Sequence, residues 1–172
     1  MDLNHLELPT TLIADLYKKS LIEPASSSLQ QEKPIEQSHV HSPWKYVGNN
    51  NKNILIIVNT NEAIHLPDNE LTFVTGILSA CKLSINDVVI VNLNNHSSNA
   101  SYKELISFFK SKIVFLFDVQ PSAFGLPVNF PHYQVQIFAN TSFLFSPSLK
   151  ELENDKLQKS KLWVCLKRLF DI

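Results

Sequence analysis

Glycine, cysteine and long apolar runs are all scarce in this chain of 172 residues. Its three glycines cannot form a GxGxxG or GxxxxGKS/T phosphate loop, which excludes the two nucleotide-binding folds built on those motifs. Cys81 and Cys165 form neither a CxxC pair nor a disulfide framework, so we expect two reduced core thiols. The apolar runs 54–58 and 113–117 have five residues each, against the roughly 20 that a membrane helix needs, so we expect no membrane contact.

The charges are nearly balanced, with 15 Lys and Arg against 16 Asp and Glu. The resulting net charge of -1 provides no global field to attract a polyanion, so any contact with nucleic acid must be weak or indirect. The first residues, 1–4, have neither a basic start nor an apolar block, and we expect a cytoplasmic protein. The length and the 44% hydrophobic content predict one soluble domain with some additional chain.

Three segments can be distinguished along the chain. Residues 1–22 include a predicted amphipathic helix over 10–22, and residues 23–43 are rich in Ser, Gln, Glu and Pro, which is typical of a flexible linker. Residues 44–172 form the predicted core domain. The short helix needs a surface to cover its apolar side, either its own core or a protein partner. The candidate partner-binding residues on that side are Leu12, Ile13, Leu16 and Tyr17.

The core domain alternates between strand and helix patterns. Strands are predicted at 53–58, 88–93, 112–117 and 133–139. Helices are predicted from 67 to 81, from 101 to 109 with a capping box of Ser101 and Glu104, from the cap Ser146 and Pro147, and from 155 to 169. This order predicts an α/β fold of three layers, in which helices cover both faces of a mainly parallel four-stranded sheet.

Ligands of parallel sheets bind at the carboxyl ends of the strands, so the residues that follow each strand are the candidates for a site. Most of them are amides and hydroxyls, which make hydrogen bonds but do not exchange protons near neutral pH. The titratable exceptions are Asp118, Glu62 and His96. We therefore expect a cleft that makes contacts, with no catalytic residue, metal or cofactor. Its candidate residues are Asn59, Asn61, Asp118 and Asn140.

The last predicted helix is basic, with Lys161, Lys167 and Arg168 near its end. Two interpretations are open. These cations can simply be solvated and stabilise the helix dipole, or they can contact a phosphate or an acidic partner segment next to Trp163.

Four stretches carry a resemblance to a known family: ILIIV at 54–58, 71–93, KIVFLF at 112–117, and 145–169. Their succession resembles the uracil-DNA glycosylase-like fold and, within it, the psi subunits of bacterial DNA polymerase III, which have this fold without enzymatic activity. Active glycosylases have a glycine-rich loop after the first strand and a His-Pro-Ser motif. Here 58–62 has no glycine, and Ser146 and Ser148 flank Pro147 in the second motif, which implies a degenerate cleft that includes both serines.

The resemblance implies a non-catalytic protein-interaction subunit whose partners belong to a replication or clamp-loader assembly. It also implies that the N-terminal segment is one of the parts that bind this assembly. An alternative is a nucleic-acid base hydrolase with an atypical site, using Asp118, or Asn59 with Ser148. A third possibility is a small-ligand or phosphoacceptor module. It is weakened because the first strand does not end in the acidic pair that would hold Mg²⁺.

Overall fold

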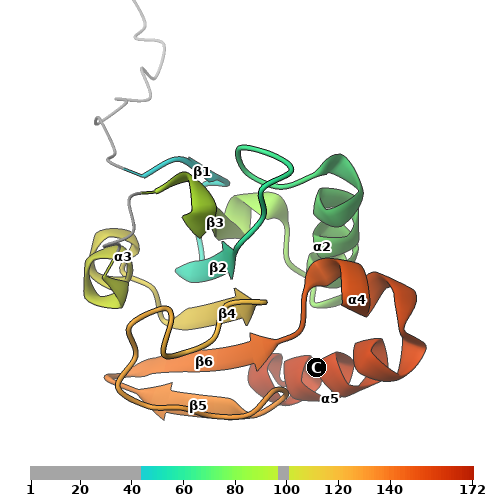
Figure 1. Cartoon of the computed structure of the whole chain (residues 1–172). Coiled ribbons are helices and arrows are strands. Elements are labelled where there is room, and N and C mark those ends of the chain that lie inside the picture. Colours follow the sequence, from blue (N-terminus) through green and yellow to red (C-terminus); the bar gives the residue numbers. More distant parts are fainter. Residues whose placement is uncertain (1–43, 97–100) are drawn as a thin grey trace, which may run out of the picture. The chain divides into compact units, whose positions relative to one another are not determined.

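The computed structural model describes residues 44–96 and 101–172, which form a six-stranded mixed sheet with helices on both faces (Figure 1). The sheet order is β1-β3-β2-β4-β6-β5. The strands are β1 (Tyr46–Val47), β2 (Ile54–Val58), β3 (Val88–Asn92), β4 (Ile113–Phe117), β5 (Val135–Phe138) and β6 (Thr141–Ser146). The central four are parallel, and the edge strands β1 and β5 are antiparallel to their neighbours. The predicted helix at 10–22 and linker at 23–43 lie outside the described residues.

In the described part of the chain, four α-helices and two short 3-10 turns accompany the sheet. They are α2 (Asp68–Ala80), η2 (Ile85–Asp87), η3 (Leu93–Asn95), α3 (Tyr102–Phe109), α4 (Leu149–Asn154) and α5 (Lys156–Phe170). One apolar cluster joins a sheet face to α2, α4 and α5. A second cluster joins the opposite face to α3 and the loop 119–130. The α/β class expected from the sequence is therefore confirmed.

The expected four-stranded, mainly parallel sheet is wrong in its last part. Residues 133–139 contain β5, which is an antiparallel edge strand, and the fourth parallel strand is β6. The chain reverses between them at Ala139 and Asn140, whose φ values are 49° and 60°. Positive φ at both central residues is the mark of a two-residue hairpin turn that usually reads Asn-Gly or Asp-Gly. The sequence Ala-Asn lacks that signal, and β1 is too short to give one.

Two predicted helix starts also need correction. Ser146 is the last residue of β6, and α4 begins after Ser148, whose hydroxyl accepts the N–H of Glu151 at 3.2 Å. Ser101 does precede α3, but its side chain makes no capping hydrogen bond. A capping box forms instead at Ser84, whose backbone N–H donates to Asp87 at 2.8 Å.

The parallel strands at the centre are apolar on both sides because both of their faces are covered. Every residue of β2 and β3 is buried. Cys81 is buried beside them, and the half-buried Cys165 donates its thiol to the Tyr133 carbonyl at 2.9 Å. Burial raises the pKa of both thiols. Both cysteines are free, as expected. Among the described helices, none is long and apolar enough to cross a bilayer.

Candidate functional site

The connections that leave β2 and β4 diverge to opposite faces of the sheet. After β2 the chain continues to α2, and after β4 it continues to the loop 119–130. Open α/β sheets bind ligands in the crevice that such a divergence leaves at the carboxyl ends of the strands. A cleft of about 220 Å³ lies at this point. We call it the strand-end cleft, and it is lined by Val58, Asn59, Thr60, Glu70, Phe117, Asp118, Ser148, Leu149 and Lys150.

The structure brings three of the sequence-predicted cleft residues together and separates the other three. Asn59, Asp118 and Ser148 all line the strand-end cleft. The remaining three do not line it: Asn61 is exposed on the loop after β2, Ser146 is buried at the end of β6, and Asn140 lies in the β5–β6 turn. Because β5 is antiparallel to β6, the turn between them lies where β6 begins. It is therefore at the amino ends of the parallel strands, whereas the cleft is at their carboxyl ends.

A buried amide at the end of β3 holds the loop that forms one wall of the cleft. Asn92 is fully buried, and its Nδ2 donates to the carbonyls of Thr60 at 2.9 Å and Ala63 at 3.0 Å. Its Oδ1 accepts the backbone N–H groups of Thr60 at 3.1 Å and Asn94 at 3.2 Å. Asn92 therefore satisfies its own polar atoms and fixes the path of residues 60–63. Its position inside an apolar strand gave no sign of this role.

The strand-end cleft contains more titratable groups than the sequence suggested. Glu70, in the first turn of α2, and Lys150, in α4, both line it together with Asp118. Burial raises the pKa of the Glu70 carboxyl; the nearby carboxylates of Glu62 and Glu153 raise it further, while Lys150 lowers it. Both helices begin at the carboxyl edge of the sheet, and a survey of their first turns would have found these residues. His96 lies elsewhere, with its ring 5.0 Å from that of Trp44.

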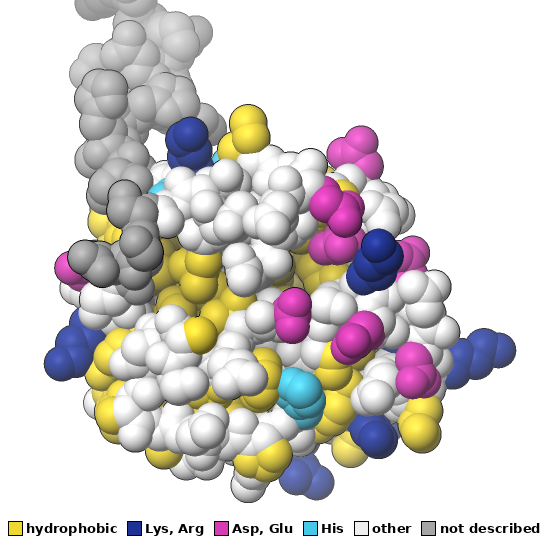
Figure 2. Space-filling view, in the orientation of Figure 1, with side chains coloured by type: hydrophobic (Ala, Val, Ile, Leu, Met, Phe, Trp, Pro, Cys, Tyr) yellow, Lys and Arg dark blue, Asp and Glu magenta, His cyan; other side chains and the backbone are white. Residues whose placement is uncertain are grey.

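The cleft and its surroundings are acidic. Figure 2 shows Asp and Glu side chains gathered over the part of the surface formed by α2 and α4. A negative surface repels the phosphates that account for most of the affinity of proteins for nucleic acids. Within residues 44–96 and 101–172, no three His, Cys, Asp or Glu side chains are grouped to hold a metal ion. The arrangement can hydrogen-bond a small polar or cationic group.

A second concave feature lies on the outside of the helical layer, between α2 and α5. α4 packs against both of these helices, and side chains of α2 and α5 meet at the core side of the layer. On their outer side, the space between α2 and α5 is an apolar groove of about 450 Å³. We call it the α2–α5 groove, and it is lined by Thr72, Phe73, Gly76, Ile77, Ala80, Lys159, Leu162, Trp163 and Leu166.

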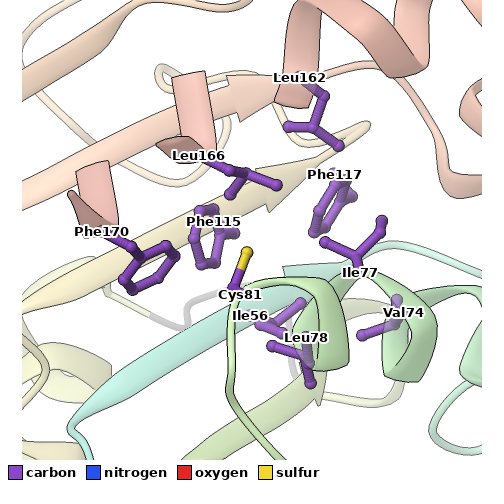
Figure 3. Close-up of a pocket in the computed structure, with 10 residues that line it drawn as sticks. All are labelled: Ile56, Val74, Ile77, Leu78, Cys81, Phe115, Phe117, Leu162, Leu166 and Phe170. Carbon is purple, nitrogen blue, oxygen red and sulfur yellow. The ribbon is translucent and has the colours of Figure 1, made fainter. Parts of the chain in front are cut away.

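The floor of the α2–α5 groove is continuous with the core. Ile77, Leu162 and Leu166 line the groove and also a small cavity of about 20 Å³ beneath it, where side chains from α2, α5 and the sheet converge (Figure 3). Gly76 leaves the groove open, since a Cβ atom placed there would have no heavy atom within 4 Å. The groove is thus an exposed extension of the apolar interior.

The predicted basic residues lie on the helix that forms one wall of this groove. Lys161, Lys167 and Arg168 are exposed on α5, and Trp163 is half-buried in the groove. The predicted partner residues Leu12, Ile13, Leu16 and Tyr17 lie outside the described part of the chain.

In comparisons with known proteins, no family model matches the chain and no curated protein matches its sequence.

Proposed function

We propose that this chain is a non-catalytic protein-binding subunit that receives a partner in the α2–α5 groove. The observation that carries the proposal is the groove itself, with its apolar floor, its half-buried Trp163 and the open space above Gly76. Aromatic side chains in apolar depressions are the typical anchors of protein interfaces. A solvent-exposed apolar surface of this kind lowers its free energy by being covered.

The resemblance to psi subunits indicates where the partner should be sought, namely in a replication or clamp-loader assembly. It also suggests that the segment with Leu12, Ile13, Leu16 and Tyr17 is a second binding site for the same assembly. Two binding sites joined by a linker bind more tightly than either alone, because the second binding event becomes intramolecular. The change Leu16→Asp in the full chain should therefore weaken retention of the assembly without altering the stability of the core.

The experiment uses two leucine substitutions on the same helix. Gly76→Leu fills the groove, whereas Ser79→Leu adds the same side chain at an exposed position of α2 that does not line it. Affinity capture with the full chain should recover clamp-loader or other replication proteins with the wild type and Ser79→Leu, and lose them with Gly76→Leu. Capture that is equal in all three proteins would disprove the role of the groove.

The alternative of a base hydrolase is supported by one observation, the position of Asp118 in an open cleft at the point where ligands of such sheets bind. The acidic surroundings of the cleft argue against it, because a nucleic-acid substrate would bring phosphates to a negative surface. Incubation with single-stranded DNA that contains uracil decides the question. Abasic sites formed by the wild type and absent with Asp118→Ala would establish the hydrolase, and we expect none with either protein.

A further inference from the structure

Resting on the proposed function, we propose that the occupant of the α2–α5 groove is an acidic amphipathic helix of a partner protein. The helix would lie along a row of small residues on α2, insert apolar side chains against Trp163, and place carboxylates beside Lys159 on the groove side of α5. The shape of the groove indicates a helix, and the charge of its α5 wall indicates the acidic character.

Helical shape is favoured by the residues on the α2 wall. Thr72, Gly76 and Ala80 follow one another at intervals of four residues, so they form one row along the helix, and all three are exposed. Rows at this spacing are the ridges that interlock when helices pack, and small side chains allow the axes to approach closely. The missing Cβ at Gly76 makes the middle of the row its lowest point, where a large apolar side chain from the partner fits.

The acidic character follows from α5. Residues 156–170 contain five cations and no acid: Lys156, Lys159, Lys161, Lys167 and Arg168. Within the described residues, none of the five forms an ion pair with a carboxylate. The capping residues Asp155 and Asp171 lie at the two ends of α5, and Lys161 is turned toward the Tyr133 ring, so α5 keeps a net positive charge with Lys159 at the groove. Such a wall attracts anions and repels basic segments, so the same apolar groove discriminates between partners by charge.

Lys159 links the charge to the groove. It lines the groove, its Nζ donates to the Glu153 carbonyl at 2.9 Å, and it lies 5.7 Å from the centre of the Phe73 ring. Its ammonium group is therefore held across the mouth between α2 and α5. A carboxylate that docks on the rim meets a positioned cation, which reduces the entropy lost on binding.

The test uses two synthetic helical peptides with the same apolar stripe, one carrying Glu and the other Lys at every polar position. The probe is the backbone amide of Gly76 in NMR spectra of the full chain, which is simple to assign because the chain contains three glycines. We expect the Glu peptide to shift this amide saturably, with a dissociation constant on the order of 100 µM. We expect the Lys peptide to bind at least about tenfold more weakly.

Variants separate charge from shape. Gly76→Leu should abolish binding of the Glu peptide, while Ser79→Leu should leave it unchanged. Lys159→Gln should weaken binding by about threefold, the range of a partly exposed ion pair, and Lys103→Gln on α3 should have no effect. Because Gly76→Leu puts a better helix former into α2, circular dichroism and urea unfolding will show that its loss of binding is not a loss of folding.

The outcomes distinguish this inference from the proposed function. Equal or tighter binding of the Lys peptide, or no shift of the Gly76 amide with either peptide, would overturn the acidic helix. The proposed function would still stand if Gly76→Leu lost its replication partners in the capture experiment. If that variant kept every partner of the wild type, the proposed function would fall, and the inference with it.

Discussion

The change Asn92→Ala should cost more stability than its single polar side chain suggests. Three of the hydrogen bonds that it removes are 2.9 to 3.1 Å long, and they join β3 to the backbone of Thr60 and Ala63. Each such bond contributes about 1 kcal/mol net, and a partner left without water costs up to about 3 kcal/mol. Because residues 60 and 63 are half-buried and water can reach them in part, we expect a loss of about 3 kcal/mol.

Urea unfolding of the full chain measures this loss. With a slope of about 1 to 3 kcal/mol per molar urea, a loss of about 3 kcal/mol lowers the midpoint by roughly 1 to 3 M. Asn94→Ala is the matched control, because Asn94 is exposed and only its backbone N–H contacts Asn92; its change should stay within about 0.5 kcal/mol. A loss below about 1 kcal/mol for Asn92→Ala, or one equal to the control, would refute the structural role of the amide.

The change Asn92→Asp makes the same reasoning depend on pH. The introduced carboxylate can still accept the two N–H groups but faces the carbonyls of Thr60 and Ala63 without a proton to donate. The ionised form is disfavoured in the folded state, so the pKa of the introduced carboxyl would lie above its unfolded value of about 3.9. The variant should therefore lose stability as pH rises above about 4 and approach the wild type as the carboxyl is protonated. A pH-independent difference would contradict this account.

Two further predictions concern glycine and Glu70. Gly48→Ala should lower the free energy of unfolding by at least about 2 kcal/mol, since φ is +104° and the new Cβ would meet the Val88 carbonyl oxygen at 2.1 Å. Gly76→Ala should raise it by about 0.5 to 1 kcal/mol, because the space around Gly76 is open. The two variants should therefore shift the urea midpoint in opposite directions. The raised pKa of Glu70 means that its ionisation opposes folding as pH rises above the unfolded pKa. Glu70→Gln should thus be more stable than the wild type at pH 7, with the difference vanishing below about pH 4, and a constant difference would count against it.

The sequence was sufficient for the three strands whose cause is local. The runs that became β2, β3 and β4 are apolar almost without interruption, and such runs are explained by burial on both faces. It was insufficient where the conformation depends on a pairing partner. The β5–β6 hairpin needs two left-handed residues at Ala139 and Asn140, a turn that the strands on either side hold in place. Because β6 was not predicted, the helix cap was predicted at Ser146, two residues before Ser148, where the structure has it.

For the candidate site, the rule that ligands bind at the carboxyl ends of strands placed Asn59 and Asp118 correctly in one cleft. It failed for Asn140 because the direction of β5 was wrong. It missed Glu70 because only residues directly after strands were considered, although helices contribute their first turns to the same edge. The α2–α5 groove could not be predicted, since it depends on how far apart two helices lie and on the open space at Gly76.

The net charge of -1 conceals a separation of charge that bears on binding. Carboxylates of Glu62, Glu70 and Glu153 interact around the strand-end cleft, whereas α5 carries five cations and no acid. At physiological salt the field of each region extends about 8 Å, so a partner experiences the region that it approaches and not the sum. An acidic segment is attracted to α5 and repelled from the cleft. The balance that argues against a polyanion ligand for the whole chain is therefore compatible with a local preference for an acidic partner at the α2–α5 groove.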